Sequence, residues 1–348
     1  MEQLNKKRIL ITGAAGFIGA NLVMDLLKRT SGATIIGIDN LNNYYDINLK
    51  LFRLEEVDNL KHNSDSSWQF IKCDISDKNK LETIFEKYDF DIIVNLAAQA
   101  GVRYSIDNPD VYMKSNVMGF YNILELCRKY PVEHLVYASS SSVYGVNEKI
   151  PYSVEDKVDN PVSLYAATKK TNELMAHVYS KLYGIPTTGL RFFTVYGPAG
   201  RPDMAYFSFT NKLINDETIK IFNYGNCKRD FTYIDDIVEG VVRVIQCAPK
   251  KDEGSVPYEI YNIGNSKPVN LLTFVEILQE ELIRAEVLAE DYNFEVHKEL
   301  VPMQPGDVAV TYADTSALER DFGFKPSTDL RTGLRRFAEW YKSFYLGD

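Results

Sequence analysis

A glycine-rich junction near the start of the chain restricts what its first half can fold into. The β-branched run over residues 8–12 predicts a buried strand, and the apolar periodicity of residues 17–30 predicts a helix. Gly13, Gly16 and Gly19 stand between that strand and the first turn of that helix. Glycine at such a junction lets the backbone approach a pyrophosphate at the helix N-terminus. A turn of purely structural convenience gives the same glycines, so the pattern needs support from its surroundings.

Strand and helix patterns keep alternating through residue 193, which predicts an α/β fold with a Rossmann-type doubly wound parallel sheet. The predicted strands are residues 8–12, 34–39, 69–72, 92–96, 134–139 and 187–192, and the predicted helices are 17–30, 78–87, 111–130 and 164–183. Beyond residue 193 the pattern is less regular and predicts a smaller C-terminal substrate-binding lobe. We assign residues 1–193, rejoined by about 231–265, to the dinucleotide-binding domain. Residues 194–230 and 266–348 then form the substrate-binding lobe.

Acidic residues at the ends of two predicted strands extend the glycine signal. Asp39 follows the last glycine by about twenty residues, where a carboxylate binds the adenosine ribose hydroxyls. The alternative for Asp39 is a solvated acid at a strand end. Residues 40–43 contain no Arg or Lys for a 2′-phosphate, so NAD is favoured over NADP. Asp74, followed by Ile75, either bonds the adenine edge or caps the next helix.

Charge and composition exclude several classes of protein. A formal net charge of -9 argues against nucleic acid or an anionic membrane as partner. The four cysteines include no CxxC pair, which favours reduced thiols over a disulfide framework. The four histidines have no metal-ligand spacing, so no metal site is predicted. Since no apolar run is long enough for a signal or a membrane span, we expect a cytoplasmic protein.

A tyrosine and a lysine one helical turn apart supply the candidate chemistry. Tyr165 and Lys169 are spaced i, i+4 and share a helix face. An ammonium beside a phenol, with a positive nicotinamide ring nearby, favours the phenolate and makes it a usable base. Such a pair arises by chance among 23 tyrosines, and alone it indicates structure. After the serine run 139–142 and the glycine junction, it indicates hydride transfer with a tyrosine moving the proton.

In these motifs the chain resembles the extended short-chain dehydrogenase/reductase family and, within it, the nucleotide-sugar epimerases. The resemblance runs from about Lys7 to Tyr341 and rests on residues 12–19, 95–98, 138–145, 165–169, 191–198 and 229–231. Residues 200–204 and 303–307 are similar to the signatures of the subfamily that epimerises UDP-glucuronate at C4.

The resemblance implies a catalytic set and a cofactor set. The catalytic residues are Tyr165, Lys169 and Ser140. Those implied to contact NAD are Gly13, Gly16, Phe17, Ile18, Gly19, Asp39, Asn40, Asn43, Asp74, Ile75, Leu96, Ala97, Ala98, Gln99, Asn116, Tyr165 and Lys169. The family also implies a homodimer through the helices at 111–130 and 164–183, although burial in a monomer gives the same apolar pattern.

The residues beside Ser140 indicate which reaction follows oxidation. Relatives that dehydrate or decarboxylate carry an acid there, whereas this chain has Ser141 and Ser142, so a cycle of oxidation and return is favoured. Thr194 stands where many neutral-sugar epimerases have Asn. The three hydroxyls, with Arg201, are predicted to bind a C6 carboxylate. The alternatives are that Thr194 packs at a strand end and that Arg201 is an ordinary loop cation.

Three further residues are candidate contacts for the nucleotide part of the substrate. Arg229 is predicted to bind the diphosphate, Phe222 either stacks on uracil or packs in the core, and Asp307 bonds a ribose. The sequence thus predicts NAD-dependent 4-epimerisation of a UDP-sugar, with UDP-glucuronate and UDP-galacturonate as the pair. Thr311 leaves room beside the sugar, so UDP-glucose or a UDP-N-acetylhexosamine is an alternative. A non-catalytic NAD-binding sensor is a second alternative, and the Tyr165–Lys169 pair counts against it.

Overall fold

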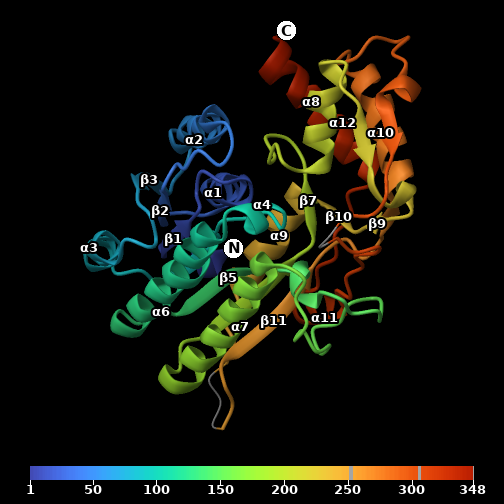
Figure 1. Ribbon diagram of the computed structural model, residues 1–348. Coiled ribbons are helices and arrows are strands. Elements are labelled where there is room, and N and C mark those ends of the chain that lie inside the picture. Colours follow the sequence, from blue (N-terminus) through green and yellow to red (C-terminus); the bar gives the residue numbers. More distant parts are fainter. Residues whose placement is uncertain (251–253, 305–306, 348) are drawn as a thin grey trace.

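The computed structural model describes residues 1–250, 254–304 and 307–347 and is built on a seven-stranded sheet (Figure 1). The strand order is β11-β6-β5-β4-β1-β2-β3, and every neighbouring pair is parallel. The strands are β1 (Arg8–Thr12), β2 (Thr34–Asp39), β3 (Ser67–Lys72), β4 (Ile92–Asn95), β5 (His134–Ser140), β6 (Thr187–Phe192) and β11 (Tyr258–Ile263). The predicted Rossmann-type parallel sheet is confirmed.

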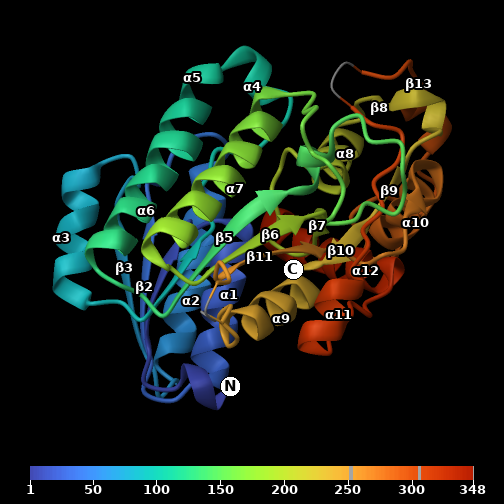
Figure 2. The same ribbon diagram turned by 90° about the horizontal axis from the view of Figure 1, so that it is seen from below.

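Helices cover both faces of this sheet (Figure 2). One face carries α1 (Phe17–Arg29), α2 (Ile47–Lys61) and α9 (Ile234–Ile245), and the other carries α3 (Lys78–Tyr88), α6 (Phe120–Lys129) and α7 (Leu164–Tyr183). Side chains of a strand alternate between faces. Ile9 and Ile11 of β1 therefore enter the core under α1, while Leu10 enters the core under α3 and α6. Burial on both faces explains why the strands read as continuous apolar runs.

Helices and short strand pairs beyond the carboxyl ends of the sheet form the smaller lobe (Figure 2). Its longer helices are α8 (Ala205–Ile214), α10 (Leu271–Arg284) and α12 (Leu330–Tyr341). The strand pairs are β7 (Thr194–Tyr196) with β10 (Phe231–Tyr233), β8 (Ile219–Ile221) with β13 (Lys298–Leu300), and β9 (Lys228–Arg229) with β12 (Val269–Asn270). Phe207 and Phe337 pack in the same continuous core as α1, so the lobes share one apolar interior.

Most predicted elements agree with the structure within two residues. The predicted helix at 111–130 is instead α5 (Pro109–Tyr112), a π-helical segment (Met113–Gly119) and α6. Inside the π segment the carbonyl of Asn116 accepts a hydrogen bond of 2.7 Å from the side-chain amide of Asn172. A side chain that takes a carbonyl out of the helical ladder accounts for such a widened turn.

Among the elements that the sequence did not predict, α2 and β11 bear on the site. Helix α2 places two cations beside the cavity, and β11 extends the sheet beyond β6. Strand β11 rejoins the sheet within the segment 231–265, which was predicted to return to the dinucleotide-binding domain. The boundaries of the two lobes remain a prediction. Of the predicted turn at 302–307, Pro305 and Gly306 lie outside the described residues. Among the described residues, no helix combines the length and apolar character that crossing a bilayer requires.

A buried ion pair fastens α7 to the sheet. Glu173 of α7 and Arg191 of β6 are joined by two contacts, Nε–Oε1 at 2.8 Å and Nη2–Oε2 at 3.0 Å, and their side chains are almost fully buried. Ser139 of β5 donates to the same carboxylate at 2.7 Å. Arg191 also donates to the hydroxyl of Tyr144, which in turn donates to Asn262 of β11. One carboxylate thus connects α7 to three neighbouring strands.

Replacing Glu173 by Gln is expected to lower the free energy of unfolding by about 3 to 5 kcal/mol, since it leaves the Arg191 guanidinium buried without a counter-charge. Urea unfolding followed by circular dichroism measures the change. The matched control is Asp58→Asn, which breaks an exposed pair with Lys61 on α2 and should change stability far less. Equal losses in the two variants would show that the buried pair does not hold the fold together.

Candidate active site

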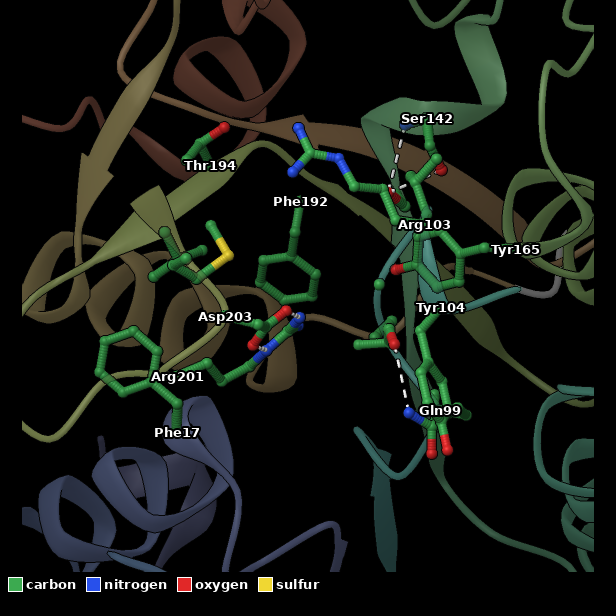
Figure 3. Close-up of a pocket in the computed structure, with 18 of the residues that line it drawn as sticks. Phe17, Gln99, Arg103, Tyr104, Ser142, Tyr165, Phe192, Thr194, Arg201 and Asp203 are labelled. Atoms are coloured by element: carbon green, nitrogen blue, oxygen red, sulfur yellow. Dashed lines mark hydrogen bonds and ion pairs between the residues drawn. The ribbon is translucent and has the colours of Figure 1, made fainter. Parts of the chain in front are cut away.

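A large cavity of about 850 Å³ lies at the carboxyl ends of the strands. It is lined by the glycine junction, the loops after β2, β4 and β5, the first turns of α7, and segments of the smaller lobe. Figure 3 shows Phe17 at one end of the cavity, with Thr194 and Tyr165 on opposite sides of its upper part. Ligands of open parallel sheets bind at this edge.

The glycine junction leaves no room for side chains. A Cβ on Gly13 would lie 2.8 Å from the amide nitrogen of Ala97, and one on Gly19 would lie 2.2 Å from the carbonyl oxygen of Gly13. Gly13 also has φ +72°, a conformation that side-chain-bearing residues rarely adopt. Gly16 and Gly19, with Phe17 and Ile18, line the cavity at the N-terminus of α1. These contacts fit a cradle in which backbone N–H groups hold a dinucleotide pyrophosphate.

Acidic residues that can accept hydrogen bonds from an adenosine lie at the far end of the cavity. Asp39 is buried at the end of β2 and lines the cavity, so it is not a solvated strand-end acid. Burial raises the pKa of Asp74, but hydrogen bonds from Ser76 and Asn40 outweigh burial and hold it below its ordinary value. Asp74 does not cap α3, because that role belongs to Asp77. Asp39, Asn40, Asp74 and Ile75 therefore share one wall of the cavity.

Ser140, Tyr165 and Lys169 meet in the middle of the cavity. The Oγ of Ser140, the last residue of β5, accepts from the backbone N–H and the hydroxyl of Ser142 at 3.2 and 3.0 Å. Since both lone pairs are used, the Ser140 proton is free to be donated toward Tyr165 or a substrate oxygen. Lys169 donates to the carbonyl of Ala138 at 2.7 Å, and its Nζ lies 6.0 Å from the centroid of the Tyr165 ring.

The electrostatics of this trio differ from the sequence expectation. Burial raises the pKa of Tyr165 above its ordinary value and outweighs the opposing effects of Ser140 and Arg201. Burial also lowers the pKa of Lys169 to about 8. The Lys169 ammonium lies near the Tyr165 ring, and its recorded hydrogen bond goes to the carbonyl of Ala138 and not to the phenolic oxygen. Two charges are expected to favour the phenolate. The positive nicotinamide ring would have to lower the pKa of Tyr165 more than the Lys169 ammonium does.

Hydroxyls and one arginine lie on the smaller-lobe side of the trio. Ser141, Ser142 and Thr194 all line the cavity. Arg201 forms a bidentate ion pair with Asp203, using Nε at 3.0 Å and Nη2 at 2.5 Å (Figure 3). That pairing leaves the Nη1 donors of Arg201 for a ligand. Arg201 is thus anchored at the cavity wall, which a free loop cation would not be.

The remaining predicted contacts line the outer part of the cavity. Arg229 pairs with Asp307 at 2.6 Å and is largely buried. Phe222 lies under the guanidinium of Arg103, which is 5.1 Å from the ring centroid. Phe222 is therefore part of the cavity wall and not of the core. Thr311 also lines the cavity, and its hydroxyl accepts from the backbone N–H of Asp230 at 3.1 Å.

Comparison with known proteins places the chain in a family. The family model described as GDP-mannose 4,6 dehydratase matches residues 10–337. The chain is similar to Protein CapI of Staphylococcus aureus, with 48% identity over 97% of this chain and 99% of that protein. It is also similar to UDP-glucuronate 4-epimerase 4 of Arabidopsis thaliana, with 45% identity over 98% of this chain and 76% of that protein.

The chain belongs to the GDP-mannose 4,6 dehydratase family. A crystal structure of UDP-glucuronic acid 4-epimerase from Bacillus cereus, in complex with UDP-glucuronic acid and NAD, superposes with a TM-score of 0.83. That protein is 33% identical, and the match covers 97% of this chain and 100% of that one. The predicted resemblance to the extended short-chain dehydrogenase/reductase family is confirmed.

Two residues predicted to contact the cofactor are not among those that line the cavity. Asn43 does not line the cavity, although its neighbours Asn42 and Tyr44 do. Asn116 is buried behind the cavity, where its side chain accepts from the backbone N–H of Gln99 at 2.7 Å and donates to the Gln99 carbonyl at 3.0 Å. Asn116 therefore fixes the loop after β4, which does line the cavity at Leu96, Ala97, Ala98 and Gln99.

Several cavity residues of this family member were missed by sequence reasoning. Lys50 of α2 lies 4.0 Å from Asp39 and bonds the carbonyl and side chain of Asn42, so a cation does stand near the ribose site. Residues 40–43 do lack Arg and Lys, and this cation was missed because it comes from a helix that was not predicted. Tyr44, Arg103 and Asp203 were also missed. Of these three residues, Arg103 was the one that the sequence could most easily have revealed. It follows β4 at the edge of the sheet where ligands bind.

Replacing Lys169 by Met is expected to stabilise the cofactor-free protein at pH 7 by a few kcal/mol. Because the pKa of Lys169 falls from 10.5 to about 8 on folding, its charge is a burden on the folded state. That burden is complete below pH 8 and disappears as pH rises to 10.5, so the advantage of the variant shrinks over this range. Urea unfolding between pH 7 and 9.5 measures it. A variant less stable than the parent at pH 7 would contradict the buried-charge argument.

Proposed function

We propose that this NAD-dependent nucleotide-sugar epimerase interconverts UDP-glucuronate and UDP-galacturonate at C4. The observation that carries the proposal is the meeting of Tyr165, Lys169 and Ser140 with the glycine cradle in one cavity whose sugar side has hydroxyls and Arg201. Serines follow Ser140 where a dehydratase needs an acid, so elimination has no base here. The relatives that epimerise UDP-glucuronate support the same substrate.

Tyr165 and Ser140 have different tasks in the proposed cycle. When held at the Gly13, Gly16 and Gly19 cradle, NAD would supply a reversible acceptor for the C4 hydride. Tyr165 removes the proton of the C4 hydroxyl, and the Ser140 hydroxyl donates a hydrogen bond that orients that oxygen. The resulting 4-keto sugar turns about its linkage to the diphosphate and presents its other face. Tyr165 then returns the proton, so C4 is inverted without net oxidation.

The substrate carboxylate is proposed to bind beside this trio. Ser141, Ser142 and Thr194 offer hydroxyl donors, and Arg201 offers its remaining guanidinium donors. Charge-assisted hydrogen bonds of this kind are roughly twice as strong as neutral ones. Arg229, at the outer end of the cavity, would neutralise the diphosphate in an otherwise acidic protein. A neutral sugar would leave the donors facing the carboxylate unpaired.

We also propose that the protein is a homodimer and that it is cytoplasmic. The outer face of α7 carries Leu174, Val178 and Leu182, each about half exposed or more. A second copy of the chain would cover this apolar face, which supports the expected homodimer. All four cysteines lie in the described part of the chain and are unpaired, which supports the cytoplasmic location expected from the sequence.

Replacing Tyr165 by Phe is expected to lower kcat for the epimerisation of UDP-glucuronate by roughly 10² to 10⁴ while NAD stays bound. Chromatography of UDP-glucuronate and UDP-galacturonate measures the rate, and equilibrium dialysis measures NAD retention. UDP-glucose and UDP-N-acetylglucosamine are run beside them. Faster turnover of either neutral sugar by the parent protein would replace the proposed substrate, and an undiminished rate in the variant would overturn the role of Tyr165.

Hydroxyls that hold the carboxylate also suppress loss of CO₂ from the keto intermediate, which is a β-keto acid. Decarboxylation requires the C5–C6 bond to align with the carbonyl π system, and a fixed carboxylate prevents that alignment. Thr194→Ala and Ser142→Ala are therefore expected to release more CO₂ per turnover than the parent protein. Radiolabelled CO₂ from C6-labelled UDP-glucuronate measures the release. The suppressing role is abandoned if both variants release no more than the parent.

A further inference from the structure

A buried arginine of α2 joins the cofactor cradle to the loop that carries Arg201. We call residues 197–203 the substrate loop. Arg53 is 1% exposed, and its guanidinium donates to the substrate loop through Nε to the carbonyl of Ala199 at 2.8 Å and through Nη2 to the carbonyl of Gly200 at 2.9 Å. Its Nη1 donates to the carbonyl of Ala15 at 3.0 Å and to the hydroxyl of Tyr45 at 2.7 Å.

Neutral groups hold this guanidinium: three backbone carbonyls, the hydroxyl of Tyr45, and the Tyr45 ring, whose centroid lies 5.5 Å from the guanidinium carbon. Among residues 1–250, 254–304 and 307–347, no carboxylate lies within ion-pair distance of Arg53. A buried cation without a counter-charge is unfavourable unless its donors are well satisfied. The planar fork of arginine can bond two successive carbonyls at once, which lysine or an apolar side chain of similar size cannot do. The geometry therefore requires an arginine at this position and not just a residue of the right volume.

Within the substrate loop, the backbone of Ala199 and Gly200 depends on contacts from outside the loop. Ala199 has φ +51°, a left-handed conformation that is unfavourable for a residue with a side chain. Gly200 packs so closely on α8 that an added Cβ would lie 1.6 Å from the hydroxyl of Tyr206. In the described part of the chain, no donor other than Arg53 reaches the carbonyls of these two residues. Arg201 follows them directly in the chain.

A second contact also joins the cofactor side of the cavity to the substrate loop. Tyr44, from the loop after β2, donates to Asp203 at 3.3 Å, and Asp203 is the carboxylate that pairs with Arg201. Tyr44 and Tyr45 are neighbours in a loop that lines the cofactor end of the cavity. The cofactor side of the cavity therefore holds the substrate loop at two places, through Arg53 at Ala199 and Gly200 and through Tyr44 at Asp203.

We propose that Arg53 is the positioning residue for recognition of the substrate carboxylate. By fixing the carbonyls of Ala199 and Gly200, it sets the place of Arg201 without contacting the substrate. This inference rests on the proposed function, because it assigns Arg53 to the part of the site that distinguishes a uronate from a neutral sugar. Loss of Arg53 then weakens binding of the carboxylate and leaves binding of the UDP portion unchanged.

The test compares UDP-glucuronate with UDP as ligands of the NAD-saturated protein, by isothermal titration calorimetry. Arg53→Met is expected to raise the Kd of UDP-glucuronate about tenfold or more and the Kd of UDP less than about twofold. Arg53→Lys is expected to lie between Arg53→Met and the parent, since it keeps the charge and can reach one of the two carbonyls. Lys61→Met, which removes an exposed cation at the end of the same helix, is the matched control and should match the parent.

A double variant shows whether Arg53 acts through Arg201. In the background of Arg201→Met, adding Arg53→Met is expected to leave the Kd of UDP-glucuronate where Arg201→Met alone has put it. Full additivity of the two changes would overturn the proposal. So would an equal loss of UDP and UDP-glucuronate binding in Arg53→Met. Circular dichroism and NAD saturation establish folding first, and if Arg53→Met does not fold, the same comparisons with Arg53→Lys decide.

The proposed function and this inference fail in different ways. If the parent protein binds UDP-glucuronate no better than UDP-glucose, the uronate assignment fails before any variant is compared. If the parent prefers UDP-glucuronate and Arg53→Met keeps the same preference, the uronate assignment stands and the positioning role of Arg53 is overturned.

Discussion

The buried ion pair between Glu173 and Arg191 is the interaction on which the geometry of the site depends. It fastens α7 to β6, and through Ser139 it includes the strand that ends in Ser140. Lys169 lies one helical turn before Glu173 on the same helix, and Tyr165 lies one turn further. The relative placement of the phenol, the ammonium and the serine hydroxyl is thus set by one buried carboxylate.

Burial fixes the positions of the catalytic side chains, but it also disfavours the charged forms that their chemistry needs. Burial raises the pKa of Tyr165 and lowers the pKa of Lys169, so both side chains are held away from the charged forms that proton transfer needs. A site in this condition is poor at proton transfer until another positive charge enters it. Bound NAD, with its pyrophosphate held by the cradle, would supply a positive nicotinamide charge, which would couple the basicity of Tyr165 to the presence of the cofactor. The arrangement also suits a cycle in which oxidation and reduction occur in one closed cavity.

Much of the Rossmann half could be read from the sequence, and the reasons for the exceptions are physical. Strands buried on both faces are continuous apolar runs, and the glycine junction and the Tyr165–Lys169 spacing are local patterns. Helix α2 has no strong apolar face, because buried positions are occupied by Lys50 and Arg53. Periodicity therefore gave no signal for it, and the two cations beside the cavity went unnoticed. The roles of Asn116 and Asp203 depend on contacts with residues remote in sequence or on side-chain direction, which spacing does not encode.

The most direct test of the central claim follows the hydrogen at C4. The protein is incubated with UDP-glucuronate carrying deuterium at C4, in ordinary water, and the UDP-galacturonate that forms is analysed by mass spectrometry and proton NMR. If C4 is oxidised and re-reduced inside one cavity, the deuterium is retained at C4 of the product. Loss of the label to solvent during inversion, or no inversion at all, would contradict the account.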